Sequence, residues 1–255
     1  MCLALLTLTS RRERDTSNKR VGALTKPSEA GRNIVAPTSG PDPLNALAML
    51  ADRVSDPSKF PVLARYVEAL PQGLASYPED RAKASLCGGM IDAFPIRTDD
   101  IPALPAELRY LVESPVPVSS WIPEVHSHAI LLAIYDRHFE TPDAFAAQAY
   151  AMQKALFSGP LYAIALKIVS PTRLLKTAAA RWRMFHRGAT FVITELAANH
   201  VMVRIEHPPF VYEPMSRRGM CEGLRAVLDL STGGGASVEM IETKSDFMTL
   251  CARWR

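Results

Sequence analysis

The chain has 255 residues, 48% of them hydrophobic, and a formal net charge of +3, so it can bury a sizeable core as one large domain or two small ones. The positive charge is concentrated at one end. Residues 1–40 contain seven Lys or Arg against three Asp or Glu, and the remainder holds 22 basic and 23 acidic side chains. The body is nearly neutral, which argues against a nucleic-acid partner, since such proteins have a basic folded surface.

Residues 1–42 are predicted to form a disordered basic leader. Residues 10–43 are rich in Arg, Ser, Thr, Pro and Gly and show no sustained apolar period, which is typical of a flexible segment. The start, MCLALLTLTSRR, is too short to span a bilayer, and its charges follow the apolar run rather than preceding it as in a secretory signal. We expect a disordered leader or an over-long start, with a short partner-binding tail as the alternative, and no membrane span.

The cysteines are far apart and form no CxxC or Cys/His cluster: Cys2, Cys87, Cys221 and Cys251. Neither a structural zinc site nor a disulfide framework is indicated. We therefore expect reduced thiols and a cytoplasmic protein.

Residues 43–255 are predicted to form one α+β domain, which could divide into a helical subdomain at 43–120 and an α/β subdomain at 121–255. Apolar spacing predicts helices in its first part, at 44–54, 60–70, 78–94, 121–139, 144–157 and 161–169. The proline-rich segment 96–120, with one helical turn at 106–112, is interpreted as a surface connector.

The segment 170–209 changes its hydrophobic period at Gly188, from a helical pattern at 172–187 to an alternating pattern that predicts a hairpin. A further helix at 212–230 and two alternating segments at 236–242 and 247–254 follow. The C-terminal third thus reads helix-ββ-helix-ββ, which predicts a four-stranded antiparallel sheet with helices on one face. The fold class is α+β, with a helical N-terminal half.

Glu124 and His128 are the strongest candidates for chemistry, because residues four apart share one helix face. His126 is two residues from His128 and points to another face. Two ligands do not make a metal site, so a helix-face pair is favoured over a metal-assisted enzyme that uses Glu124, His128 and perhaps His186. His186 precedes Gly188, the expected helix C-cap. The helix dipole favours a cationic side chain there, and this structural role is enough to explain His186. The chain has no GxSxG or phosphate-loop motif, so we predict no catalytic set and no cofactor.

The helix predicted at 172–187 has one basic stripe and one apolar face. The basic stripe consists of Arg173, Lys176, Arg183 and Arg187. It could bind phosphate or an acidic partner, but we favour the interpretation that it is a solvent-exposed helix face. The opposite face is expected to pack on the sheet through Leu174, Leu175, Ala178, Trp182 and Phe185.

Four segments resemble an uncharacterised protein family found mainly in myxobacteria: YPEDRAKASLCGGMIDAF, ELRYLVESP, WIPEVHSHAILLAIYDRHF and ALFSGPLYAIALKIVSPTRLLKTAAARWRMFHRG. The resemblance covers residues 77–255 and implies a shared shape. More loosely, helix-ββ-helix-ββ resembles the fold of haem nitric-oxide sensor domains, vinyl-reductase-like domains and vesicle-tethering subunits. This implies a small hydrophobic ligand or a protein partner between helices and sheet. The haem sensors carry a Tyr-x-Ser-x-Arg signature that this chain lacks, so the resemblance implies no haem.

The leading hypothesis is a non-enzymatic cytoplasmic binding or sensory module, with a role in signalling, that holds a small apolar ligand or a partner helix. The expected ligand-binding residues are those directed inward, namely His128, Tyr135, Trp182, Phe185 and Phe191. The alternatives are the metal-assisted enzyme and a dimeric scaffolding protein, which would form a homodimer through its helices.

Overall fold

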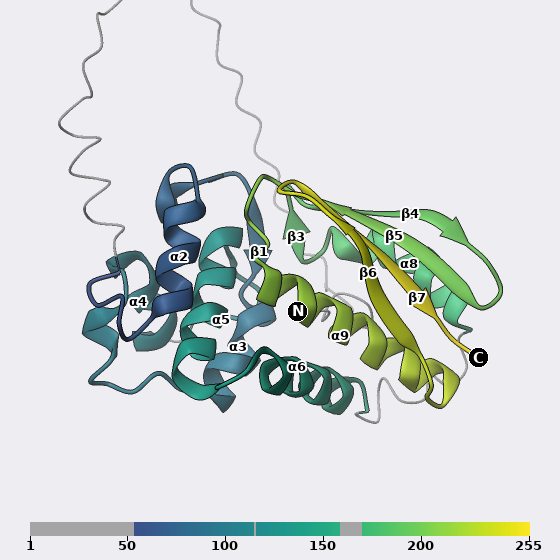
Figure 1. Ribbon diagram of the computed structural model, residues 1–255, viewed down its shortest axis with the longest axis horizontal. Helices are drawn as coiled ribbons and strands as arrows, with labels where there is room; N and C mark the ends of the chain where they lie inside the picture. Colours follow the sequence, from purple (N-terminus) through teal and green to yellow (C-terminus); the bar gives the residue numbers. More distant parts are fainter. Residues whose placement is uncertain (1–53, 115, 159–169) are drawn as a thin grey trace, which may run out of the picture.

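The computed structural model describes residues 54–114, 116–158 and 170–255. It confirms the α+β class, with a mainly helical first half and a four-stranded antiparallel sheet in the C-terminal third (Figure 1). The expected leader and helix at 161–169, and all but the last residue of the expected helix at 44–54, lie outside the described residues.

The first half is built around one buried helix, α5 (Glu124–His138), against which α2 (Pro61–Ala69), α3 (Ser85–Ala93) and α4 (Ala106–Glu113) pack. Helix α5 is apolar on nearly all sides, as expected for a helix enclosed by others; its buried apolar residues are Val125, Ala129, Ile130, Leu131, Leu132, Ala133 and Ile134. Two short 3₁₀ turns lie beside this group, at Gly73–Ala75 and Ile101–Ala103.

Asp136 of α5 holds the start of α2 in place. Its carboxylate accepts hydrogen bonds from the backbone N–H groups of Val62 (3.0 and 3.1 Å) and Leu63 (3.0 Å). The first N–H groups of a helix have no partner within it, so a carboxylate there both satisfies them and complements the helix dipole.

The C-terminal third has the predicted four-stranded antiparallel sheet, in the order β4 (Thr190–Leu196), β5 (His200–Glu206), β7 (Phe247–Arg253), β6 (Ser237–Thr243). Its register places the buried residues of β5 and β7 opposite one another, at Val201–Ala252, Val203–Leu250 and Ile205–Met248. Helices α8 (Pro171–Trp182) and α9 (Pro214–Thr232) pack against the sheet, and α6 (Pro142–Phe157) packs along α9 (Figure 1).

The structure has a second, three-stranded sheet that was not predicted, and its strands make three of the predicted helix boundaries wrong. This sheet has the order β2 (Trp121–Pro123), β1 (Arg81–Lys83), β3 (His186–Arg187). Residues 81–83 lie near the start of the helix expected at 78–94, residues 121–123 start the one expected at 121–139, and residues 186–187 end the one expected at 172–187. All three segments are strands instead. Such short strands have no period of their own, and pairing with distant segments decides their conformation.

Gly188 is therefore not a helix C-cap, because α8 ends at Trp182 and Gly188 joins β3 to β4. Its φ is +101°, and a Cβ atom added there would collide with the carboxylate of Asp80. Glycine is required at this position both by the backbone conformation and by the close approach of Asp80.

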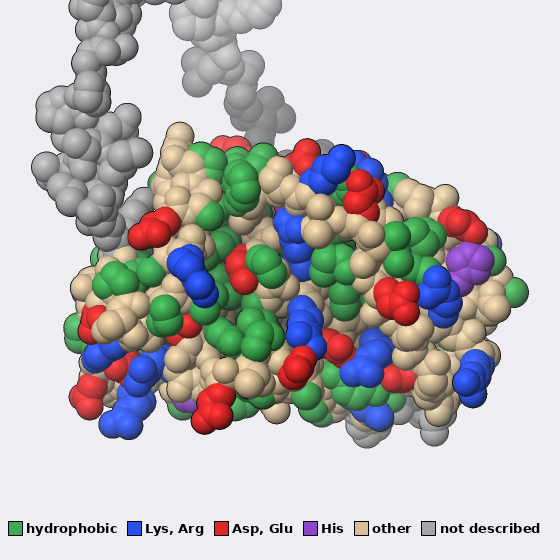
Figure 2. Space-filling model, viewed as in Figure 1, with side chains coloured by type: hydrophobic (Ala, Val, Ile, Leu, Met, Phe, Trp, Pro, Cys, Tyr) green, Lys and Arg blue, Asp and Glu red, His purple; other side chains and the backbone are tan. Residues whose placement is uncertain are grey.

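The stripe residues predicted on the helix at 172–187 are exposed, namely Arg173, Lys176, Arg183 and Arg187. Only the first two lie within α8, and the Arg187 guanidinium is 4.0 Å from the centre of the Trp121 ring. On the face seen in Figure 2, acidic and basic side chains are interspersed among apolar ones. No helix in the described part of the chain is long and apolar enough to cross a bilayer.

Candidate functional site

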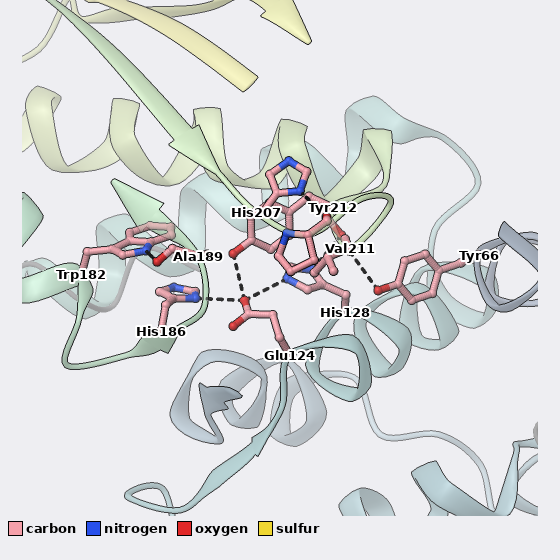
Figure 3. Close-up of polar contacts among 11 residues, drawn as sticks. Tyr66, Glu124, His128, Trp182, His186, Ala189, His207, Val211 and Tyr212 are labelled. Carbon is pink, nitrogen blue, oxygen red and sulfur yellow. Dashed lines mark hydrogen bonds and ion pairs between the residues drawn. The ribbon is translucent and has the colours of Figure 1, made fainter. Parts of the chain in front are cut away.

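A buried carboxylate lies where the two halves of the structure meet. Glu124 is the first residue of α5 and is 2% exposed. Its Oε1 accepts three hydrogen bonds, from His186 Nδ1 (2.9 Å), the Tyr212 hydroxyl (3.0 Å) and His128 Nε2 (3.3 Å) (Figure 3). We call these four residues, together with Ser216, the Glu124 network. A buried charge needs such partners because it has lost its hydration.

The hydrogen bonds of the network determine the tautomer of His128. Burial lowers the pKa of this histidine, against the opposing attraction of Glu124, so the ring is neutral at pH 7. Its Nε2 donates to Glu124, and its Nδ1 therefore accepts a hydrogen bond from the Ser216 hydroxyl, at 3.0 Å. The Ser216 proton is thus directed toward His128, and only a lone pair of its oxygen is free for another group.

Glu124 itself is ionised. Burial by itself would raise its pKa, but the attraction of His186 and the hydrogen bonds from His128 and His186 outweigh burial and lower the pKa to about 2. Burial and the neighbouring carboxylate raise the pKa of Tyr212, which keeps its proton. A carboxylate with so low a pKa is a poor general base at neutral pH.

Aromatic contacts fix the network from both ends. The Trp182 ring stacks on His186 with centroids 3.9 Å apart and planes at 14°, and its Nε1 donates to the Ala189 carbonyl. On the other side, His128 meets Tyr212 edge to face at 4.7 Å. Among the described residues, Glu124 Oε2 and His186 Nε2 have no hydrogen-bond partner.

A cavity of about 130 Å³ lies beside the network, among α3, α5, α6 and α9. The described residues that line it are mostly apolar and include no charged side chain: Ser85, Leu86, Gly89, Met90, Leu131, Leu132, Phe145, Ala149, Met152, Gln153, Met215, Ser216 and Gly219. Gly89 is exposed, so part of the wall lies at the molecular surface. Ser216 belongs to both the cavity and the network, and thus connects them.

Gln153 is the unusual residue of the cavity wall. It is 5% exposed, and its Oε1 accepts no hydrogen bond from any residue that the structure describes. Leaving a buried polar group without a partner costs roughly 1–3 kcal/mol. The Gln153 oxygen therefore needs a hydrogen-bond donor that the described residues do not supply.

None of the five expected ligand-binding residues is part of the cavity lining, but three contact residues that are. His128 hydrogen-bonds Ser216, and Tyr135 meets the Phe145 ring edge to face at 5.8 Å. Phe185 packs with Leu86. The remaining two, Trp182 and Phe191, lie together on the sheet side of the network, with ring centroids 5.5 Å apart.

The expected pair of Glu124 and His128 is confirmed, and the structure adds His186 to the same carboxylate oxygen. The ring nitrogens that face Glu124 donate to it. Within the described residues, no group of three or more His, Cys, Asp or Glu side chains has an arrangement that could hold a metal ion.

Three cysteines lie in the described part of the chain, and all are reduced and buried: Cys87, Cys221 and Cys251. Burial raises the pKa of the Cys87 thiol to about 11, so this thiol is not a reactive nucleophile at neutral pH.

No protein-family model and no curated protein matches the chain, so the expected membership of a myxobacterial family has no support from these comparisons. The chain is similar to solved structures of H-NOX proteins, at TM-scores below 0.5. An Fe(II) unliganded H-NOX protein from K. algicida has a TM-score of 0.44 and 9% identity, over 67% of this chain and 95% of that one. An oxygen-binding H-NOX domain related to soluble guanylate cyclases has a TM-score of 0.41 and 10% identity, over 76% and 93%. A T. Tengcongensis H-NOX mutant has a TM-score of 0.36 and 9% identity, over 76% and 96%. Likeness at this level says nothing about the ligand or activity of this chain.

Proposed function

We propose that this protein is a non-enzymatic binding or sensory module that holds a small apolar ligand in the cavity among α3, α5, α6 and α9. The observation that carries the proposal is an apolar cavity whose wall contains Gln153, a buried side chain whose Oε1 has no hydrogen-bond partner among the described residues. A polar group kept in such a place at a cost in stability is typical of a binding site.

The cavity volume favours a small molecule over a partner helix. At about 130 Å³ it is close to the ~150 Å³ of an apolar cavity that binds benzene. An α-helix with its side chains is about 10 Å across and cannot enter.

The connection between cavity and network supports a sensory role. Ser216 lies on α9, lines the cavity and hydrogen-bonds His128, which in turn donates to Glu124. Helix α9 also packs on β6 and β7. A ligand that displaces Ser216 would therefore disturb both the buried carboxylate and the contact of α9 with the sheet. In this proposal His128, Tyr135 and Phe185 support the cavity wall, while Trp182 and Phe191 hold the sheet side of the network.

The test is thermal unfolding with a panel of benzene-sized apolar compounds, because a ligand that binds only the folded state raises Tm. Ala149→Leu places a larger side chain in the cavity wall. Ala151→Leu is the matched control, since Ala151 is an exposed residue of the same helix.

We expect at least one compound to raise Tm for the wild type and for Ala151→Leu but not for Ala149→Leu. A panel without effect on the wild type, or a ligand that stabilises Ala149→Leu equally, would overturn the proposal.

A further inference from the structure

The chemistry of the cavity wall also indicates what kind of ligand it takes, an inference that rests on the proposed function. We infer that the ligand is a neutral aromatic molecule of about the size of phenol that carries a single hydroxyl group. Three features of the wall carry this inference, and each excludes a different class of compound.

The lining excludes charged ligands. Among the described residues that line the cavity, the polar side chains are Ser85, Gln153 and Ser216, and none is Lys, Arg, His, Asp or Glu. A carboxylate or ammonium group that entered would lose its hydration without gaining an opposite charge. The negative charge of Glu124 does not serve as a counter-charge, because His128, His186 and Tyr212 already surround it.

The lining favours an aromatic ring over an aliphatic group of the same size. Met90, Met152 and Met215 all contribute to it, and methionine sulfur makes favourable contacts with aromatic rings. Phe145 adds a ring whose orientation is fixed by Tyr135 and Phe139, which it meets at 87° and 89°. A flat ligand can therefore pack between a rigid aromatic wall and adaptable thioethers.

The unpartnered Oε1 of Gln153 needs a hydrogen-bond donor, and a hydroxyl group on the ligand supplies one without adding a charge. The last torsion of a glutamine side chain is broad, so the amide can turn either its oxygen or its nitrogen toward the cavity. A hydroxyl can donate to the first or accept from the second, and it therefore satisfies Gln153 in both orientations. The free lone pair of Ser216 offers a second acceptor, because its proton is directed toward His128.

The inference is tested by titration calorimetry of the full chain with four compounds: phenol, toluene, cyclohexanol and benzoate. The first pair differs in the hydroxyl, phenol and cyclohexanol differ in the ring, and benzoate adds a charge. We expect phenol to bind about tenfold more tightly than toluene, which corresponds to one net hydrogen bond. Cyclohexanol should bind more weakly than phenol, and benzoate should not bind detectably.

Gln153→Met removes the amide and keeps an unbranched side chain of similar length. We expect it to bring the affinities for phenol and toluene within about twofold of each other, with the affinity for toluene unchanged. Gln148→Met, at a partly exposed position on the same helix outside the cavity lining, should keep the tenfold preference.

The outcomes separate this inference from the proposed function. Equal wild-type affinities for phenol and toluene would overturn the hydroxyl requirement, and cyclohexanol binding as tightly as phenol would overturn the aromatic requirement; both leave the cavity as a ligand site. These comparisons use only the wild type, so they hold even if Gln153→Met does not fold. If none of the four compounds binds the wild type and the apolar panel has no effect on its Tm, the proposed function fails as well.

Discussion

Replacing Glu124 by glutamine tests whether the buried network is held together by charge. The variant Glu124→Gln keeps the shape of the side chain, but an amide oxygen receives the three donors now bound to Oε1. Removing one charged partner from a buried, hydrogen-bonded pair lowers stability by about 3–5 kcal/mol. Because the amide retains part of this hydrogen bonding, we expect a loss of about 3 kcal/mol in the free energy of unfolding at pH 7.

The pH dependence of this difference provides a second readout. Burial raises the pKa of Glu124, but His186 and the hydrogen bonds of both histidines lower it to about 2, from an ordinary value of 4.5. Between about pH 2 and pH 4.5, the folded state thus binds fewer protons than the unfolded state. The contribution of the carboxylate is complete above about pH 4.5 and is lost as the pH falls toward 2. The difference in the free energy of unfolding between the wild type and Glu124→Gln should therefore become smaller below about pH 4.5.

Urea unfolding at several pH values measures both effects, and an exposed pair provides the control. Glu195 binds His200 at 2.7 Å, but the two side chains are 60% and 32% exposed. Glu195→Gln should change stability by less than about 1 kcal/mol. If Glu124→Gln were as stable as Glu195→Gln, or if its loss of stability were the same at pH 6 and pH 3, the charge of Glu124 would not hold the network together.

Three further substitutions test the supporting structure, each by urea unfolding with the wild type as reference. Gly188→Ala should lower the free energy of unfolding by at least about 2 kcal/mol. Gly234 has a φ of +117° and open space around its Cβ position, so Gly234→Ala should lower it by about 1 kcal/mol. Equal losses would mean that Asp80 exerts no steric effect. Asp136→Ala should cost about 1–2 kcal/mol through the lost cap of α2, and an unchanged stability would contradict this role. Gly219→Ala should stabilise α9 by about 0.5–1 kcal/mol, since the added methyl group meets its nearest neighbour at 3.8 Å; a loss would indicate strain.

Local patterns predicted the elements whose conformation depends on neighbours in sequence. The alternation at 191–195 and 201–205 correctly placed a hairpin, because a short turn brings the two strands together. The pair of Glu124 and His128 followed from a spacing of four on a helix.

The rest depends on contacts between distant parts of the chain. His186 and Tyr212 reach Glu124 from 62 and 88 residues away, and no helical or strand period encodes such a meeting. Strand β3 has two residues, too few to show alternation, so its segment was assigned to the preceding helix.

The candidate site was predicted from large aromatic residues, whereas the cavity exists where side chains are small or flexible. Gly89, Gly219 and Ala149 leave the space, and methionines surround it. The sequence around Gln153 gave little signal, because the Ala-rich helix α6 also carries Asp143, Gln148 and Lys154. The burial of Gln153 against α3 and α9 could not be known without the packing of four helices.

NMR of protein labelled at its methionine methyl groups can show directly whether a small aromatic alcohol occupies this cavity. At saturating phenol we predict nuclear Overhauser contacts from the phenol ring to Met90, Met152 and Met215, which line the cavity. We predict none to Met248, a buried residue of strand β7, or to the exposed Met184. Contacts to Met248 or Met184 alone, or none to any methionine, would mean that phenol does not bind in this cavity.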